Sequence, residues 1–223
     1  MALHKLRHYI FIDPKNIHSH INESKLLEHI KCIHHKQYIN GEIVKYYGYN
    51  DIGKLLKKFD KQLYELFVQL NYNYPALLAD IGRYVILYYY GGIYHDLKFM
   101  SNKKLIDYLE NISTDIELIC EEHPLETHRI RNGNIISLKK KHNYFAKILN
   151  KIKSKLIVSN NAYGPNVMYE IGSGLYIDEF KKNKCKNIIK VPFLNKNMIV
   201  CDNYIYGKNT KTWQNTYEAI FRL

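Results

Sequence analysis

The stretch from Ala79 to Met100, ADIGRYVILYYYGGIYHDLKFM, constrains the fold of this chain more than any other. An apolar run carries Asp80 and Arg83, stops at Gly91-Gly92, and is followed by a short apolar pair and a polar cluster. Apolar residues at helical spacing before a glycine predict a helix and its end. The pattern therefore predicts a helix, a buried strand, and polar side chains at the carboxyl end of that strand, where open α/β sheets bind ligands.

The rest of the chain alternates between strand-like and helix-like patterns. Tyr9 to Ile12 is a short apolar run, residues 22–36 have one apolar helical face, and Glu42 to Tyr47 is a second strand-like run. A strand, a helix and a strand in this order predict a parallel pair with a right-handed crossover. Further helices are expected over residues 50–59 (capped by Asn50), 62–70, 75–90, 105–109, 143–152, 164–169 and 213–221, and further strands over residues 93–94, 116–120, 134–138, 188–191 and 198–201.

This order predicts one α/β domain over residues 1–223, with helices on both faces of a mostly parallel sheet. At 46% hydrophobic residues, the chain can bury a full core. The formal net charge of +12 favours anionic partners such as nucleic acid, phosphates or an acidic membrane. A coding bias toward Lys, Asn, Ile and Tyr, typical of an AT-rich genome, explains the same charge, so the charge does not choose among these partners.

The N-terminal residues 1–14 contain only a short apolar run, and no window reaches the roughly 20 apolar residues of a membrane span. We therefore expect a soluble, cytoplasmic protein without a signal peptide or transmembrane segment, located in the host cytoplasm or the virion if the coding bias reflects a viral source. Peripheral contact with a membrane stays open. The 4 cysteines show no CxxC pair and no zinc spacing, which indicates free thiols in a reducing compartment.

Two pairs of charged residues flank the glycines. Asp80 and Arg83 share one helix face, either as a local ion pair or as a site in which the carboxylate accepts sugar hydroxyls and the guanidinium binds phosphate. Asp96 and Lys98 point to the same side of an extended chain, either as an ion pair or as two groups that divide a nucleotide diphosphate between them. His95 should point away from Asp96.

These residues carry a resemblance to a known family. The set Asp80, Arg83-Tyr84, Tyr90 to Tyr94 and Asp96 resembles D-x-x-R-Y followed by Y-G-G-I-Y-x-D-x-D, the DXD region of glycosyltransferase family 32. That family contains capsular-polysaccharide and yeast-type mannosyltransferases and is distantly similar to the clostridial glucosylating toxins. The match fails at its last position, where Lys98 stands in place of the second aspartate.

Weaker similarities extend over most of the chain. His8 to Ile12 resembles the family's opening strand, H-x-I-W, with Phe11 in place of Trp. Asn132 and Ser137 fit the motif N-x-x-x-x-S, and His142 stands where a family histidine follows. Gly164-Pro165 fits the family's GP turn, and Thr212-Trp213 stands where the family has Ser-Trp. The histidine that usually precedes the last motif is missing.

The resemblance implies a GT-A fold, a nucleotide-sugar donor, and retaining transfer of a hexose to a glycan or glycoprotein acceptor. UDP is favoured over GDP as the nucleotide. The implied catalytic residues are Asp80, Arg83, Asp96 and Lys98. The implied nucleotide-sugar-binding residues are Ile10, Phe11, Ile12, Tyr94, Asp96, Asn132 and Trp213, with Phe11 stacked on the base.

The replacement at Lys98 bears on the cofactor. In the family, the second DXD carboxylate holds Mn²⁺ or Mg²⁺ against the diphosphate. An ammonium group does not ligate a metal, but it supplies positive charge directly. One hypothesis is that Lys98 takes the place of the cation, so that no metal is required; Mn²⁺ or Mg²⁺ held by Asp96 is the alternative. A second hypothesis is a degenerate site that binds a nucleotide sugar without turning it over.

A basic nucleic-acid-binding module is the main non-enzyme alternative. The net charge of +12, the run Lys139-Lys140-Lys141 and the 21 tyrosines favour it. No nucleic-acid-binding motif is present, and most tyrosines lie in apolar runs typical of a core, so this alternative is disfavoured. Glu121-Glu122 follow an expected strand and could reach the site, but a solvated loop is the favoured interpretation.

Overall fold

The computed structural model describes residues 2–13, 27–28, 31–32, 34, 41–97, 99–101, 103–122, 130–158, 171–182, 187–191 and 198–200. They form a six-stranded sheet in the order β2-β1-β3-β6-β5-β7. Its strands are β1 (Leu6–Ile10), β2 (Ile43–Tyr47), β3 (Gly92–His95), β5 (Leu118–Glu122), β6 (Ile130–Ser137) and β7 (Ile188–Val191). β6 is antiparallel to its neighbours β3 and β5, whereas the other neighbouring strands are parallel, so the expected mostly parallel sheet is confirmed.

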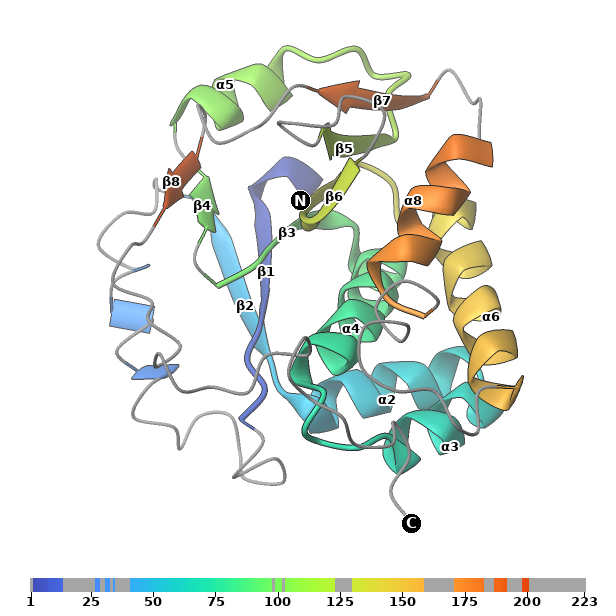
Figure 1. Ribbon diagram of the computed structural model, residues 1–223. Coiled ribbons are helices and arrows are strands. Elements are labelled where there is room, and N and C mark those ends of the chain that lie inside the picture. The colour runs from blue at the N-terminus through green and yellow to red at the C-terminus, as the bar shows by residue number, and fades with distance from the viewer. Residues whose placement is uncertain are drawn as a thin grey trace.

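Helices cover one face of the sheet, and smaller elements cover the other (Figure 1). The first group is α2 (Tyr49–Phe59), α3 (Lys61–Gln69), α4 (Pro75–Tyr90), α6 (Asn143–Val158) and α8 (Ser173–Lys182). The second group is α5 (Lys103–Glu110) and a two-stranded sheet of β4 (Phe99–Ser101) and β8 (Met198–Val200). A 3-10 helix, Leu3–Lys5, precedes β1. No described helix combines the length and apolar character needed to cross a bilayer.

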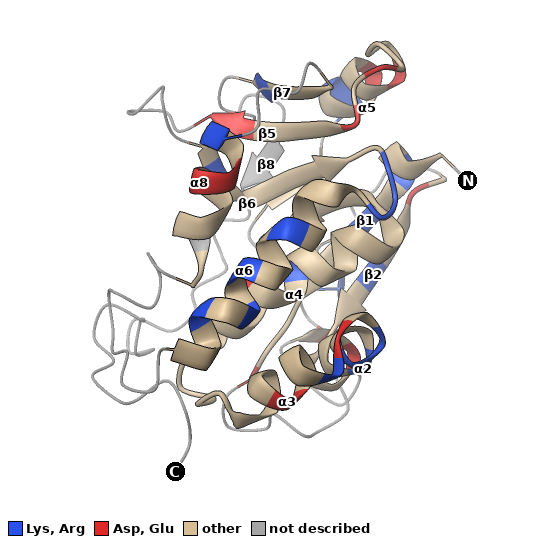
Figure 2. Cartoon of the chain, turned by 90° about the vertical axis from the view of Figure 1, so that its right-hand side faces the viewer, with Lys and Arg blue, Asp and Glu red and all other residues tan. Residues whose placement is uncertain are grey.

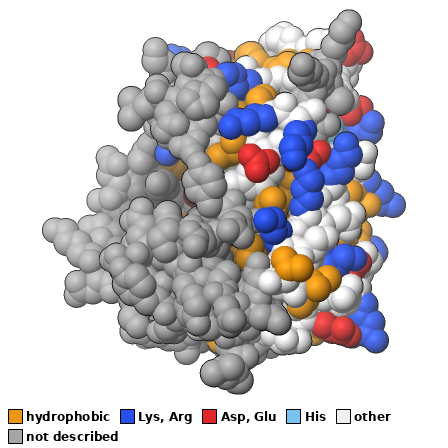
Figure 3. Space-filling model, turned by 45° about the vertical axis from the view of Figure 1, so that its right-hand side comes forward, with side chains coloured by type: hydrophobic (Ala, Val, Ile, Leu, Met, Phe, Trp, Pro, Cys, Tyr) orange, Lys and Arg blue, Asp and Glu red, His pale blue; other side chains and the backbone are white. Residues whose placement is uncertain are grey.

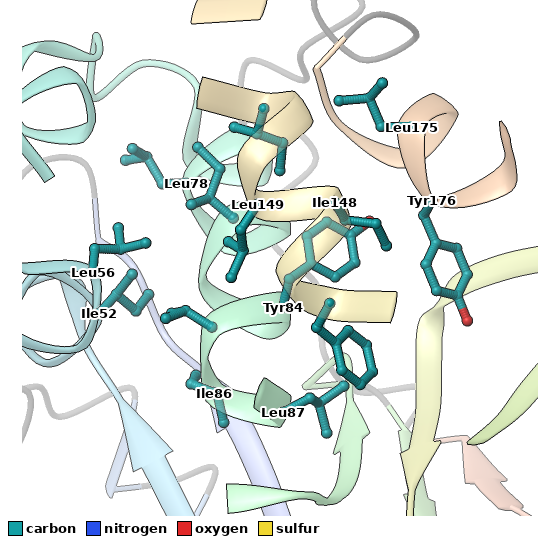
Figure 4. Packing of buried hydrophobic residues seen from close by; sticks show 14 of the residues in the cluster. Ile52, Leu56, Leu78, Tyr84, Ile86, Leu87, Ile148, Leu149, Leu175 and Tyr176 are labelled. Atoms are coloured by element: carbon teal, nitrogen blue, oxygen red, sulfur yellow. The ribbon is translucent and has the colours of Figure 1, made fainter. Parts of the chain in front are cut away.

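Successive strand residues belong to different hydrophobic clusters because side chains alternate across a sheet. Ile93 packs under α5, whereas Tyr94 packs on the side of the large helices. Figure 4 shows that larger cluster, in which Tyr84 of α4 lies between the sheet-facing side chains of α6 and α8. The rings of Tyr84 and Tyr176 stack with centroids 5.8 Å apart. This packing holds α4, which carries two of the expected site residues, firmly against the sheet.

The helix α4 begins and ends where its sequence predicts. Pro75 occupies the first turn, where its missing N–H costs nothing, and Gly91 ends the helix with φ 60°. The next residue, Gly92, has φ 91°, and a Cβ there would lie 2.8 Å from the Leu6 carbonyl oxygen. His8 Nε2 donates a hydrogen bond of 2.7 Å to the Gly91 carbonyl. The glycine pair thus lets the chain turn back and place β3 beside β1.

Some boundaries differ from expectation. The first strand is Leu6–Ile10 rather than residues 9–12, because its parallel register pairs Leu6 with Ile43 and ends with β2. The second helix is capped by Gly48 rather than Asn50, and Asp51 Oδ2 accepts a hydrogen bond of 3.0 Å from the Gly48 N–H.

Other expectations concern whole elements. The structure adds β4 and α8, which sequence patterns did not indicate. The expected helices over 164–169 and 213–221, and most of that over 22–36, lie outside the described residues. Among the cysteines in described positions, Cys32 and Cys120 are free thiols.

Candidate active site

Asp80 and Arg83 form a buried ion pair on α4, with 2.8 Å between Asp80 Oδ1 and Arg83 Nη2. Their side chains are 2% and 6% exposed, so the pair does not lie on a solvated helix face. Asp80 Oδ1 also accepts a hydrogen bond of 2.9 Å from Asn132 Nδ2 of β6. Asp80 Oδ2 is buried and has no hydrogen-bond partner among the described residues. A buried acceptor of this kind is costly unless a ligand or water satisfies it.

The guanidinium of Arg83 connects this pair to the end of β3. Arg83 Nη1 donates to the Asn132 carbonyl oxygen and lies 3.6 Å from Asp96 Oδ1. The Tyr94 ring lies under the guanidinium, 4.8 Å from Arg83 Cζ, and the Tyr94 hydroxyl donates a hydrogen bond of 3.0 Å to Asp96 Oδ1. Asp80, Arg83, Tyr94, Asp96 and Asn132 are hereafter the Asp80–Asp96 cluster. The Asp96 side chain is 37% exposed, so the cluster reaches solvent through this carboxylate.

An irregularity in β6 aims two asparagines in different directions. Cys120 of β5 pairs with Ile135, but the next residue, Glu121, pairs with Arg131, which leaves residues 132–134 as extra length in β6. Extra residues of this kind re-aim side chains and are common next to active sites. Asn132 therefore bonds to α4, as above, whereas Asn134 bonds to side chains of β3 and β5.

Gly133 lies at the centre of this irregularity and lets β6 pass close to Asp96. The Gly133 carbonyl accepts a hydrogen bond of 2.8 Å from the Asp96 N–H. A Cβ at Gly133 would lie 2.8 Å from Asp96 Oδ2. The Asp96 N–H is thus fixed to β6, and the space beside its carboxylate depends on the glycine.

Burial and charge set the protonation of the cluster. Burial raises the pKa of Asp80 to about 6, and the repulsion of Asp96 adds to that effect, although Arg83 and Asn132 favour the carboxylate. Burial disfavours the guanidinium of Arg83, but the attraction of Tyr94 and the two carboxylates outweighs burial and raises the pKa of Arg83. Arg83 is therefore charged at every working pH, whereas Asp80 changes its charge near neutrality.

The opposite face of β3 carries a buried chain of hydrogen bonds. Ser101 Oγ lies 2.8 Å from His95 Nε2, and His95 Nδ1 lies 2.9 Å from Asn134 Oδ1. Asn134 Nδ2 donates to Glu121 Oε2 at 2.8 Å. Because the Asn134 oxygen is an acceptor, His95 donates from Nδ1 and accepts at Nε2. Burial lowers the pKa of His95 to about 3, so the ring is neutral, and it points away from Asp96 as expected.

The two glutamates after Cys120 are not part of the Asp80–Asp96 cluster, nor do they form a solvated loop. They end strand β5, where Glu121 is 1% exposed and bonded to Asn134. Glu122 forms a salt bridge of 2.6 Å with Lys190 of β7. The expectation of a loop was wrong because the strand continues to Glu122, and pairing with β6 and β7 covers its end.

The three residues expected at the nucleotide lie at the carboxyl end of β1, the same sheet edge as Asp96. Ile10 packs in the core beside α4, where a Cβ at Gly82 would lie 3.0 Å from Ile10 Cδ1. Phe11 packs on the other face of the sheet, and Ile12 is partly buried against the helical core. Gly82 thus allows the turn of α4 between Asp80 and Arg83 to approach β1.

Two other expected residues lie away from the cluster, and two are not described. Ser137 pairs with Gly92 at the opposite end of β3, and His142 Nε2 lies 3.3 Å from Glu117 Oε2. Lys98 and Trp213 lie outside the described residues. Sequence reasoning missed Gly82 and Gly133, although a glycine inside a helix or strand is itself a signal of close approach.

The described side chains do not fit a resident metal ion. No group of three His, Cys, Asp or Glu side chains in the described part of the chain is placed to hold one. The exposed carboxylate, Asp96, has the guanidinium of Arg83 3.6 Å from Oδ1, and this fixed positive charge opposes a cation at the same oxygen. Asp80 is buried and paired with Arg83.

Comparisons with known proteins agree with this geometry. Residues 15–123 match the family model described as glycosyltransferase sugar-binding region containing DXD motif. A solved structure described as PaToxG Glycosyltransferase is similar, with a TM-score of 0.51 and 19% sequence identity over 81% of this chain and 69% of that chain. No curated protein sequence matches significantly. Residues 15–123 are therefore similar to a glycosyltransferase sugar-binding region, and the fold of the chain is GT-A-like.

Proposed function

We propose that this protein is a glycosyltransferase that moves a hexose from a nucleotide sugar, with a UDP-sugar favoured, to a glycan or protein acceptor with retention of configuration. The observation that carries the proposal is the buried Asp80 Oδ2, which lacks a hydrogen-bond partner among described residues inside a charged cluster that opens at Asp96. Asp80, Arg83, Tyr94 and Asp96 lie within residues 15–123, the segment that matches the sugar-binding model, whereas Asn132 lies beyond it. A donor hydroxyl at this oxygen would supply the missing hydrogen bond.

In this proposal, Asp80 and Asp96 accept hydrogen bonds from the donor. Asp80 receives sugar hydroxyls, and the more exposed Asp96 receives those of the ribose. Arg83 donates from Nε to the Ala79 carbonyl at 3.4 Å, from Nη1 to the Asn132 carbonyl and from Nη2 to Asp80. Each guanidinium nitrogen therefore already has a hydrogen-bond acceptor within the protein. Its role is to neutralise two neighbouring carboxylates, which would otherwise repel one another.

The leaving diphosphate needs positive charge, and we propose that Lys98 supplies it in place of a divalent metal. Lys98 occupies the position of the second DXD aspartate, two residues after Asp96. An ammonium group neutralises the leaving group without metal ligands. In this proposal Ile10, Phe11 and Ile12, together with Trp213, are the residues that contact the nucleotide.

The test is a panel of UDP- and GDP-sugars, measured by thermal shift and by release of free nucleotide, with Mn²⁺ and with EDTA. We expect one UDP-sugar to raise the unfolding temperature and to be hydrolysed or transferred equally well under both conditions. Asp96→Asn should reduce nucleotide release by roughly 100-fold. The matched control is Asp107→Asn, on the exposed side of α5, which should leave release unchanged.

The outcomes separate the parts of the proposal. Nucleotide release that disappears with EDTA and returns with Mn²⁺ would show that Lys98 does not replace the metal. A thermal shift without release or transfer under any condition would indicate a binding protein rather than an enzyme. If no nucleotide sugar produces a shift, the donor assignment itself is wrong.

A further inference from the structure

Many lysines of this protein are paired with carboxylates, whereas several exposed lysines, among them one cluster, have no carboxylate partner among the described residues. The paired set comprises Lys5 with Glu110, Lys31 with Glu28, Lys61 with Glu65, Lys139 with Glu117, Lys147 and Lys151 with Glu179, Lys153 with Asp60, and Lys190 with Glu122. On the side of the molecule that carries α6 and α8, blue and red side chains are accordingly interspersed (Figure 3). Several lysines on that side therefore have a carboxylate partner within the protein.

A second group of lysines lies around the C-terminal end of α4 and has no carboxylate partner among described residues. We call it the basic patch, and it consists of Lys45, Lys58, Tyr88, Tyr89, Tyr90, Lys140 and Lys141. All four lysines are exposed, and the three tyrosines are partly exposed. Figure 2 shows blue segments of β2, of α2 and of the turn before α6 on the same side of the molecule.

Cation–π, ring and backbone contacts connect members of the basic patch. Lys45 Nζ lies 5.3 Å from the centroid of the Tyr90 ring, and Lys58 Nζ lies 5.2 Å from that of Tyr89. The rings of Tyr89 and Tyr90 are 6.5 Å apart. The turn before α6 is attached through the N–H of Lys141, which donates a hydrogen bond to the carbonyl of Tyr88 in α4. Residues from three separate parts of the chain therefore form one continuous surface.

The carboxylates of the neighbouring helices are already engaged. Asp51 accepts from the Gly48 N–H, Asp60 binds Lys153, and Glu65 pairs with Lys61. Lys58 lies in the last turn of α2, where a cation also interacts favourably with the helix dipole. The helix dipole therefore accounts for an unpaired lysine at position 58. It does not account for Lys45, which is on a strand, or for Lys140, which is in a turn.

The basic patch and the candidate active site lie at opposite ends of strand β3. Tyr90 directly precedes Gly91 and the amino end of β3, whereas Asp96 directly follows the carboxyl end of β3. A partner bound at the patch would therefore leave the donor site accessible.

We propose that the basic patch binds the anionic surface of a lipid bilayer. Unpaired lysines near an anionic leaflet gain attraction that is not offset by internal partners. Tyrosine is enriched where protein meets the headgroup region, because its ring is apolar and its hydroxyl is polar. The patch combines both residue types on exposed positions, and it holds the protein on the membrane as a peripheral contact.

The ring geometry favours lipid over nucleic acid. Single-stranded nucleic acid binds to aromatic residues by stacking its bases on open ring faces. In the patch, the ammonium groups of Lys45 and Lys58 lie over the rings of Tyr90 and Tyr89, so these faces are occupied. Headgroup phosphates need only the charges of the four lysines, all of which are exposed.

The experiment is co-sedimentation of the full chain with phosphatidylcholine vesicles that contain either 30% phosphatidylserine or none, with the percentage chosen as roughly that of an acidic leaflet. We expect binding to the anionic vesicles alone, reduced by added salt. The triple variant Lys45→Glu, Lys58→Glu and Lys140→Glu should bind at least about tenfold less.

A second triple variant, Lys104→Glu, Lys181→Glu and Lys182→Glu, changes the net charge equally at exposed positions on α5 and α8 and should keep most of the binding. Equal losses in both triple variants would overturn the proposal, because the effect would then follow net charge and not the patch. Absence of binding by the unmodified protein, or binding to single-stranded oligonucleotides but not to vesicles, would also overturn it.

Asp96→Asn should bind vesicles normally, which keeps this test separate from the donor assignment. Unchanged thermal unfolding of each variant shows that it is folded.

Discussion

Asn132 Nδ2 donates a hydrogen bond of 2.9 Å to Asp80 Oδ1, across 52 residues of sequence. The bond joins the irregular part of β6 to the middle of α4, and the Asn132 carbonyl accepts from Arg83 in the same contact. One asparagine therefore bonds to both members of the buried ion pair. Because Asn132 is next to Gly133, the same segment also holds Asp96, whose N–H donates a hydrogen bond to the Gly133 carbonyl.

Replacement of Asn132 tests this connection. Asn132→Ala removes a neutral hydrogen-bond donor to Asp80 and should weaken the affinity for the nucleotide sugar by roughly 10- to 100-fold, the size expected for one hydrogen bond to a charged group. Because Asn132 favours the carboxylate, the variant should also shift the pH midpoint of donor binding upward from the Asp80 pKa of about 6. Calorimetric titration between neutral and mildly acidic pH measures both. Asn150→Ala, on the exposed side of α6, is the matched control, and a similar loss there would contradict the assignment.

The ion pair itself should contribute to stability mainly through the cost of breaking it. Arg83→Met leaves the Asp80 carboxylate buried without its partner and should lower the free energy of unfolding by about 3–5 kcal/mol. Adding Asp80→Asn to that variant removes the uncompensated charge and should recover part of the loss. Urea unfolding of the two single variants and the double variant gives the coupling energy. Additive losses would show that the two side chains do not interact as the structure indicates.

The space beside Asp96 depends on Gly133. Gly133→Ala places a Cβ 2.8 Å from Asp96 Oδ2, and the carboxylate, as the end of a side chain, can move away. We therefore expect a fall in donor affinity with a small change in stability. Gly53→Ala in α2 is the comparison, because its Cβ would meet Tyr64 at an ordinary 3.4 Å and helix propensity should stabilise it by about 0.5–1 kcal/mol. Unfolding midpoints and donor titrations distinguish the two; a Gly133→Ala variant with normal affinity would contradict this account.

Buried neutral histidines should make the protein sensitive to acid. Burial lowers the pKa of His8 and of His34 from 6.5 to about 4, and that of His95 to about 3. Below pH 6.5 the unfolded chain binds these three protons and the folded chain does not, so the free energy of unfolding should fall as the pH decreases toward 4. Asp80 acts in the opposite direction, because its folded pKa of about 6 exceeds the ordinary aspartate value of 3.8, but it contributes one proton against three.

Urea midpoints measured at several pH values between neutrality and about 4 check this prediction. His34→Gln should reduce the slope of the free energy of unfolding against pH by the contribution of up to one proton. The reason is that glutamine can form hydrogen bonds to Tyr46 and to the Leu97 carbonyl but does not titrate. A midpoint that does not change over this range would show that the histidines titrate normally in the folded protein.

The order of elements around the glycine pair followed directly from local chemistry. Pro75 and Gly91 mark the two ends of helix α4, because proline suits the first turn of a helix and glycine suits its end. The apolar residues between them indicate the helix itself. The position of Asp96 at the carboxyl end of β3 and the direction of His95 away from Asp96 likewise followed from strand alternation. By contrast, the bounds of β1 were set by its pairing with β2, which local patterns do not contain.

The composition of the site divides in the same way. Sequence alone placed Asp80 and Arg83 on one helix face and Asp96 at a strand end, because those relations depend on a few consecutive residues. Only the tertiary structure decided that the helix pair is buried, that Arg83 bridges both carboxylates, and that Glu121 belongs to a separate chain of hydrogen bonds. These outcomes depend on the irregular register of β6 and on the close approach at Gly133, and both arise from contacts between segments distant in sequence.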